Sequence, residues 1–478
     1  MKQIIQHLKS GEILLEEVAV PKVAPGHLLI QTSCSFISAG TERMLVEFGR
    51  AGYLAKARQQ PEKAKQVLDK IRTDGLVQTA QSVMAKLSQP IPMGYCNAGR
   101  VLEVGDGVDG FRVGDRVASN GPHAEVVTVP KHLAAKVPDS VSDDQACFTV
   151  LGSIALQGIR LVNPTLGETI AVFGLGLIGL LAVQILKAHG ARVIGFDYDG
   201  ERVDLARRFG VEAEDLASGT DPVQAARVFT KELGVDGVLV TAATKSDELM
   251  HQAARMCRKR GRIVLTGVTG LDLQRSDFYE KELTFQVSCS YGPGRYDPGY
   301  EEMGQDYPLA FVRWTEQRNF EAVLQLMSEK RLSTDELISE RVPLAEAKRA
   351  YDAVAAKNVI GVMLTYPDHQ TEQARQALTA RVVHHHAPRG KADVAVCGLI
   401  GAGSFAQHKI LPALVKANAR LKWVVTSTGL SGSTAARRFG IEQSTTDIRQ
   451  LLDDPDVNAV VIATRHNMHA PLAIQALE

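Results

Sequence analysis

The run Ile170-Ala171-Val172-Phe173-Gly174-Leu175-Gly176-Leu177-Ile178-Gly179 decides the fold of the central part of this chain. A short apolar stretch leads into glycines with the spacing of a turn that opens a helix. The glycines allow a tight turn and close approach of the backbone, and the helix N-terminus offers free N–H groups to a pyrophosphate. We therefore predict a dinucleotide site here, with contacts from Gly174, Gly176, Leu177, Ile178 and Gly179.

A second pattern of the same kind lies near the end of the chain. The apolar run Val394-Ala395-Val396-Cys397 leads into Gly401-Ala402-Gly403-Ser404-Phe405-Ala406, which opens a helical pattern. The contacts expected at this second site are Gly401, Gly403, Ser404 and Phe405. Predicted strands at 393–397, 421–426 and 458–463 amount to half of a doubly wound sheet, so we expect residues 391–478 to be a truncated domain, either naturally or through the gene model.

Composition excludes several classes of function. The chain has 478 residues, which predicts more than one domain, and its 54 Lys and Arg balance 54 Asp and Glu. Without a basic excess we expect no nucleic-acid and no membrane partner. Six scattered cysteines without CxxC pairs, and an N-terminus without a signal-peptide core, predict a cytoplasmic protein.

The pattern divides the chain into segments of different character. Residues 1–150 alternate short strands with turns and predict a β-barrel-like unit, interrupted by a helical insertion at 43–90. Residues 151–294 alternate strands and helices and predict a doubly wound α/β domain. Residues 295–366 predict mixed secondary structure that includes helices. Residues 367–390 are polar, and we interpret them, with His384-His385-His386, as a linker without a metal site.

The first 366 residues resemble the medium-chain dehydrogenase/reductase family, the fold of zinc alcohol dehydrogenases. The resemblance is carried by several motifs: Ser38-Ala39-Gly40-Thr41-Glu42, Gly94-Tyr95-Cys96-Asn97-Ala98-Gly99, Val104-Gly105, Val113-Gly114-Asp115-Arg116-Val117, the fingerprint at 174–179, Asp197, and Gly261-Arg262-Ile263-Val264-Leu265-Thr266-Gly267. It implies a GroES-like catalytic domain, split in sequence into 1–150 and 295–366, around a Rossmann domain at 151–294.

This chain departs from the zinc members of that family at the metal positions. They have a Cys where this chain has Ala39, and Gly-His-Glu where it has Gly94-Tyr95-Cys96. The lobe of four close cysteines that binds structural zinc is also missing, and the insertion 43–90 occupies its place. Since Cys34 and Cys96 alone cannot supply four ligands, we expect no zinc.

Residues 391–478 resemble the N-terminal half of the Gfo/Idh/MocA family. The resemblance rests on two motifs, Gly398 to Gly403 and Ala463-Thr464-Arg465-His466-Asn467-Met468-His469. The resemblance implies cofactor contacts from Thr464, Asn467 and His469. Together with Ser290-Tyr291-Gly292-Pro293-Gly294-Arg295-Tyr296-Asp297, the order of the two modules resembles bi-domain oxidoreductases associated with bacterial sugar or polysaccharide metabolism.

Coenzyme preference at the first site depends on Asp197, which ends the strand 192–197. A carboxylate there accepts hydrogen bonds from a ribose 2′-OH and repels a 2′-phosphate, so we predict NAD(H). Arg202 is close to Asp197 in sequence, and a positive charge there weakens the discrimination against a 2′-phosphate. Thr241 and Gly267 complete the expected contacts. The corresponding strand end of the second unit, Thr426 to Gly429, has no acid, and NAD, NADP or an empty site all stay open there.

Three residues are candidates for catalysis. Tyr95 stands where the family places a ligand His, and its hydroxyl is the simplest substitute for zinc at the substrate oxygen. Its pKa would have to be lowered for proton transfer. Tyr291 is the rival donor, and Arg295 can hold a carboxylate or phosphate by a bidentate fork. His123 lies in a predicted turn, and we assign it no catalytic or binding role.

These features predict a zinc-independent, NAD(H)-dependent dehydrogenase or reductase for a small hydroxyl or carbonyl substrate, which the resemblance suggests is sugar-derived. A quinone- or enoyl-type reductase, and a nucleotide-binding scaffold without turnover, are the alternatives. We also expect a homo-oligomer, either a dimer or a tetramer. The sequence leaves the substrate and the direction of reaction open.

Overall fold

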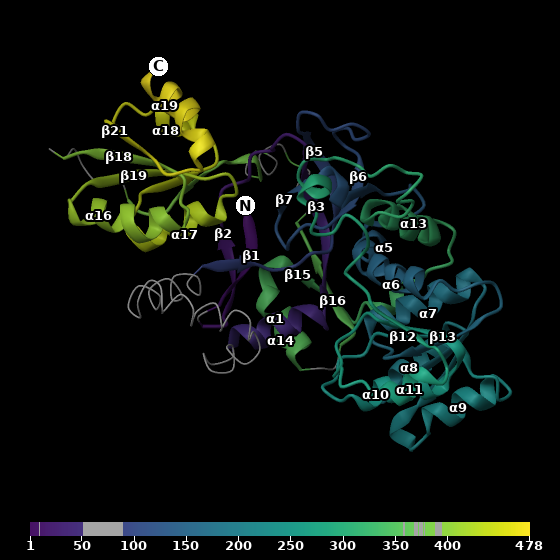
Figure 1. Cartoon of the computed structure of the whole chain (residues 1–478). Helices are drawn as coiled ribbons and strands as arrows, with labels where there is room; N and C mark the ends of the chain where they lie inside the picture. Colours follow the sequence, from purple (N-terminus) through teal and green to yellow (C-terminus); the bar gives the residue numbers. More distant parts are fainter. Residues whose placement is uncertain are drawn as a thin grey trace.

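The computed structural model describes residues 1–8, 10–50, 89–356, 359–367, 371, 376, 378–387 and 394–478. It confirms the predicted fold class, an α/β protein with a β-rich first unit and two doubly wound units (Figure 1). The helical face expected at Leu76, Ala80, Val83, Met84 and Leu87 lies outside these residues. Within the described ranges, every helix is too short or too polar to cross a bilayer.

The first unit is built on two sheets. A three-stranded sheet has the order β2-β1-β4, and a seven-stranded sheet has the order β15-β16-β3-β5-β6-β8, with β7 also paired to β3. The strands are β1 Lys2–His7, β2 Ile13–Glu17, β3 His27–Ser38, β4 Pro90–Pro92, β5 Asn97–Val104, β6 Arg116–Ser119, β7 Val126–Pro130, β8 Ala134–Lys136, β15 Glu340–Pro343 and β16 Gly361–Thr365. Since β16 pairs antiparallel with β3, the chain returns to this unit after the central domain.

Helices close the ends of the first unit. They are α1 Thr41–Arg50, α5 Asp143–Ala146, α12 Pro298–Glu301, α13 Glu316–Ser328 and α14 Ala347–Ala355. The helix α1 begins directly after β3, inside the region where the sequence predicted a helical insertion. Apolar residues of β3, α1, α14 and β16 share one buried cluster, which places the Ser38-to-Glu42 turn against the core.

The central unit is a six-stranded parallel sheet with the order β11-β10-β9-β12-β13-β14. The strands are β9 Thr169–Phe173, β10 Arg192–Asp197, β11 Glu212–Asp215, β12 Val235–Val240, β13 Cys257–Leu265 and β14 Thr284–Val287; the main helices are α6 Thr149–Val162, α7 Leu177–His189, α8 Gly200–Arg208, α9 Pro222–Phe229 and α10 Glu248–Met256. The strand order reverses between β9 and β12, and ligands of such sheets bind in the crevice beyond that point.

Successive residues of β9 show how the helices cover both faces. Ile170 and Val172 pack with residues of α6 and α7, whereas Ala171 and Phe173 pack with residues of α9 and α10. Because side chains alternate along a strand, an uninterrupted apolar run buries both faces at once. The sequence therefore located this strand correctly from a run of four residues.

The C-terminal unit has five strands where the sequence predicted three. Its sheet order is β17-β20-β19-β18-β21, from β17 Val382–His384, β18 Val396–Ile400, β19 Arg420–Val425, β20 Gln443–Thr445 and β21 Ala459–Ile462. The extra strands are three residues long, too short to show a period. One of them, β17, lies within the predicted linker and pairs antiparallel with β20, so His384 belongs to the sheet. Its helices are α16 Leu411–Lys416, α17 Leu430–Phe439, α18 Arg449–Leu452 and α19 His469–Leu477.

The C-terminal unit contacts the first unit through the last turn of α17. Arg437 forms an ion pair with Glu16, and its guanidinium donates to the Glu17 carbonyl at 3.2 Å. Figure 1 shows the yellow-green unit beside the purple strands β1 and β2 and away from the teal helices of the central domain.

The same contact continues at the start of α17. A Cβ added to Gly429 would lie 2.2 Å from the Ala19 carbonyl oxygen, and Gly429 has a φ of +73°. The Thr446 hydroxyl donates to the Val20 carbonyl at 2.5 Å. The segment 16–20 thus runs along the whole of α17, and only a glycine fits where the two backbones meet.

We predict that Gly429→Ala loosens this contact. Its methyl group would collide with Ala19, in addition to roughly 1–2 kcal/mol of backbone strain. The control is Gly440→Ala at the other end of α17, where φ is also positive, at +68°, and the backbone is in the left-handed helical region. Amide hydrogen exchange of residues 18–20 should become about tenfold faster only in Gly429→Ala. Equal exchange in both variants would contradict a tight interface.

Candidate active site

The first fingerprint forms the turn that the sequence predicted. Gly174 follows β9 with a φ of +89°. A Cβ added to Gly179, in the first turn of α7, would lie 1.9 Å from the Gly174 carbonyl oxygen. Leu177 and Ile178 begin α7, so their N–H groups lie at the open end of the helix. This cradle fits a dinucleotide pyrophosphate.

Asp197 lies against this turn. Its carboxylate accepts hydrogen bonds from the N–H of Leu175 at 2.6 Å and from the N–H of Asp199 at 3.0 Å. Arg202 is on the same side: it forms an ion pair with Asp199 at 3.1 Å, and a Cβ on Gly176 would be 3.9 Å from its Nη1. The structure therefore brings the predicted acid and the predicted cation to one edge of the glycine turn.

The opposite wall of the crevice comes from the ends of β12 and β13. The Thr241 hydroxyl lies 2.6 Å from the Gly174 carbonyl oxygen and donates to it. A Cβ on Gly267 would lie 2.1 Å from the Ala242 carbonyl oxygen. Thr241 and Gly267 thus face the fingerprint across the point where the strand order reverses.

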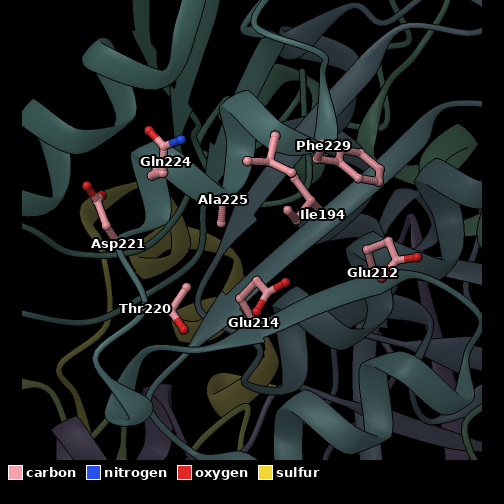
Figure 2. Close-up of a pocket in the computed structure, with 9 residues that line it drawn as sticks. Ile194, Glu212, Glu214, Thr220, Asp221, Gln224, Ala225 and Phe229 are labelled. Carbon is pink, nitrogen blue, oxygen red and sulfur yellow. The ribbon is translucent and has the colours of Figure 1, made fainter.

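A separate hollow lies between the edge strand β11 and α9 (Figure 2). Its lining includes the acids Glu212, Glu214 and Asp221, beside Ile194 and Phe229. None of the predicted cofactor contacts lines this hollow. Three acidic groups also disfavour a phosphate-bearing ligand, so we do not place the nucleotide there.

Tyr95 follows the turn residue Gly94, and its ring packs against the main core cluster. Its hydroxyl is enclosed and makes no hydrogen bond with any residue that the structure describes. Burial raises the pKa of Tyr95, and the nearby Ser38 and Thr41 hydroxyls act weakly in the opposite direction. The pKa is thus raised, where the sequence argument required it to be lowered, because an enclosed phenolate would lose its hydration.

Tyr291 lies in the loop that re-enters the first unit. Its hydroxyl accepts a hydrogen bond from Asn120 Nδ2 at 2.7 Å, and burial raises its pKa. The Arg295 guanidinium lies 5.3 Å from the Tyr291 ring and donates to Glu301 at 2.6 Å. Arg295 is therefore engaged within its own loop.

Glu316, at the start of α13, was not identified from the sequence. Its side chain is fully buried, and both carboxyl oxygens lack a hydrogen-bond partner among the described residues. Burial raises the pKa of Glu316 to about 9, with the charge of Glu301 adding to the rise and Arg295 opposing it. A neutral carboxylic acid thus lies close to Tyr291 and Arg295.

The positions of the zinc ligands do not form a ligand set in this fold. Ala39 has no donor atom, and Cys96 is buried with a raised pKa. Cys34 and Cys147 are paired with each other in the core, with their sulfur atoms 3.0 Å apart. Across the described ranges, His, Cys, Asp and Glu nowhere gather in threes with metal-binding geometry. We derive no step through zinc.

In the second fingerprint, Gly401 lies close to Thr464, another residue predicted to bind the cofactor. Gly401 has a φ of +96°, and a Cβ there would lie 2.8 Å from the Ala463 carbonyl oxygen and 3.1 Å from Thr464 Cγ2. A ring nitrogen of His469 lies 3.0 Å from the Thr464 carbonyl oxygen. Gly403 has open space around it, Ser404 and Phe405 are exposed, and Asn467 lies in the short helix His466–Met468.

Three family models match this chain. Residues 63–139 match the alcohol dehydrogenase GroES-like domain, 178–304 match the zinc-binding dehydrogenase model, and 395–478 match the oxidoreductase family with an NAD-binding Rossmann fold, Gfo/Idh/MocA.

Relatives and solved structures agree with these models. D-guloside 3-dehydrogenase of Escherichia coli is 29% identical over 269 residues, which cover 54% of this chain and 72% of that protein. (R,R)-butanediol dehydrogenase of Bacillus subtilis is 28% identical over 285 residues, covering 53% and 74%. The alcohol dehydrogenase TADH from Thermus sp. ATN1 superposes with a TM-score of 0.59 at 20% identity, covering 77% of this chain and 100% of that one.

These matches support an oxidoreductase of the medium-chain alcohol dehydrogenase type in the first two units. The whole chain joins this oxidoreductase to a Gfo/Idh/MocA-type nucleotide-binding domain. The resemblance inferred from the motifs is confirmed for both modules.

We predict that Glu316 makes stability fall as pH rises. Between pH 4.5 and about 9, the unfolded chain loses this proton while the folded chain keeps it, so each pH unit costs at most about 1.4 kcal/mol. Glu316→Gln should remove this cost. The gain in melting temperature over the wild type should therefore grow from about pH 6 to about pH 8. The exposed control Glu302→Gln should show no such trend, and a constant difference for Glu316→Gln would refute the assignment.

Proposed function

We propose that this protein is a zinc-independent, NAD(H)-dependent dehydrogenase that interconverts a hydroxyl and a carbonyl group on a sugar-derived substrate. The observation that carries the proposal is the enclosed hydroxyl of Tyr95, which lies near the Ser38 and Thr41 hydroxyls but has no hydrogen bond of standard geometry to a described residue, at the position where the family resemblance places a zinc ligand. The names of relatives, D-guloside 3-dehydrogenase and (R,R)-butanediol dehydrogenase among them, support a polyhydroxylated substrate.

When bound, the nicotinamide supplies or accepts the hydride. The protein must then stabilise the negative charge that develops on the carbonyl oxygen during reduction. Tyr95 stays protonated because burial raises its pKa, so it is available as a hydrogen-bond donor to that oxygen. In the oxidation direction, the positive charge of the oxidised nicotinamide would lower this pKa and favour loss of the proton.

Tyr291 is the alternative donor. Its hydroxyl already accepts a hydrogen bond from Asn120 and retains its own proton for donation. Arg295 is bound by Glu301, so it acts in this proposal on the ring of Tyr291 and not as a free anion site.

We predict that Asp197→Ser narrows or reverses the preference for NAD(H) over NADP(H). The wild-type carboxylate, anchored by the N–H of Leu175, repels a 2′-phosphate, and Arg202 lies close enough to attract one once the acid is gone. The ratio of kcat/KM for the two coenzymes measures the effect. A wild type that prefers NADPH, or an unchanged ratio in the variant, would contradict the role of Asp197.

We predict that Tyr95→Phe lowers kcat on the order of 10²-fold with little change in coenzyme binding, because it deletes the donor and keeps the ring. Tyr300→Phe, which deletes a buried hydroxyl that donates to Thr315, is the matched control for loss of a buried hydroxyl. Elemental analysis of the same untagged preparation should find well under one zinc per chain. Activity of Tyr95→Phe within about threefold of wild type would transfer the role to Tyr291; one tightly held zinc would defeat the zinc-independent proposal.

A further inference from the structure

A buried pair of ionisable groups lies behind Tyr95. Nε2 of His123 is 3.1 Å from Oε2 and 3.2 Å from Oε1 of Glu42, and both side chains are 0% exposed. Glu42 also accepts hydrogen bonds from the Tyr351 hydroxyl at 2.5 Å and from the N–H of Ser38 at 3.3 Å. A carboxylate this deeply buried is tolerated only with such a set of donors.

The other side of His123 continues the network. Its Nδ1 lies 2.7 Å from the Ser35 hydroxyl, which is 2.8 Å from the Tyr366 hydroxyl. One assignment of protons satisfies every contact: Tyr366 donates to Ser35, Ser35 donates to Nδ1, and Nε2–H donates to Glu42. In this assignment Nδ1 of the His123 ring is the acceptor and Nε2 is the donor.

This network holds both segments that enclose the Tyr95 hydroxyl. Gly94, directly before Tyr95, has a φ of +89°, and a Cβ there would lie 2.5 Å from the His123 ring. On the other side, Glu42 binds the N–H of Ser38, whose hydroxyl lies beside that of Tyr95. His123 thus packs under one segment, and Glu42 is hydrogen-bonded to the other.

We propose that Glu42 and His123 are positioning residues, which hold the Tyr95 hydroxyl against the substrate oxygen. This inference rests on the proposed function of Tyr95. Both side chains are buried and engaged in hydrogen bonds within the network, so their effect on Tyr95 passes through the turns at Gly94 and Ser38. Sub-ångström misplacement of a reacting group is enough to slow catalysis.

A merely structural pair would behave differently. Its loss would lower stability and the fraction of folded protein, but each folded molecule would keep its kcat. The outermost member of the same network supplies the control, because the Tyr366 hydroxyl is hydrogen-bonded to Ser35 and is one step further along the network than His123. Its hydroxyl can be deleted with a comparable change in buried polarity.

The test compares Glu42→Gln with Tyr366→Phe, with kcat normalised to active sites counted by NADH titration. Glu42→Gln should lower kcat about tenfold at unchanged NADH affinity. It should also move the basic limb of the kcat–pH profile to lower pH, because the Glu42 charge helps to raise the pKa of Tyr95. Tyr366→Phe should lower the melting temperature and leave kcat and the profile within about twofold of wild type. Equal kcat in both variants would overturn the inference.

Two further variants separate the inference from the proposed function. In a Tyr95→Phe background, Glu42→Gln should add less than about a twofold loss, because both act on one hydroxyl. A full tenfold loss there would overturn the inference while Tyr95 keeps its role. If Tyr95→Phe alone is fully active, the role proposed for Tyr95 fails, and this inference fails with it.

Should Glu42→Gln fail to fold, Tyr351→Phe replaces it. This variant removes only one donor to Glu42 and keeps the ring. It should lower kcat about threefold at unchanged NADH affinity. A Tyr351→Phe enzyme with wild-type kcat would overturn the inference.

Discussion

The backbone ladder of β3 is the constraint on which the first unit depends. This twelve-residue strand pairs along one edge with β5, and along the other with β7 near its start and β16 near its end. Pairing with β16 draws the chain back after the central domain, and with it the loop of Tyr291 and the helix α14. The turn that follows β3 carries Ser38 to Glu42. One strand thus fixes the relative positions of β5, β7, β16 and the Ser38-to-Glu42 turn.

Burial gives this site its electrostatic character. Tyr95, Tyr291 and Glu316 all have raised pKa values, and desolvation is the largest cause in each case. These groups are neutral donors at neutral pH. Glu42 is the contrasting case, because three hydrogen-bond donors surround its carboxyl group. A site of neutral donors suits stabilisation of a developing oxyanion.

The C-terminal unit is attached to the oxidoreductase by more than a connecting segment. The segment 16–20 follows α17 from Arg437 to Gly429, and Gly429 lies in the short loop between β19 and α17. In doubly wound sheets this strand end is where a nucleotide ribose is recognised. The backbone of the first unit therefore packs against the loop between β19 and α17.

Local patterns predicted the parts of this protein whose structure is local. The predictions were correct for the fingerprint at 174–179, for the strand ending in Asp197 and for the order of the modules. Such strand–glycine–helix patterns depend only on residues that are neighbours in sequence. The two short strands β17 and β20 were missed, because three residues carry no period and their pairing is long-range.

The sequence by itself determined two Rossmann-type modules and an altered set of zinc positions. Only the tertiary structure decided that His123, which appeared to be an ordinary turn residue, meets Glu42 across 81 positions of chain. It also decided that the pKa of Tyr95 is raised. The physical reason is the same for both: the desolvation of a group and the partner that compensates it depend on which distant segments pack around it, and no local pattern encodes that.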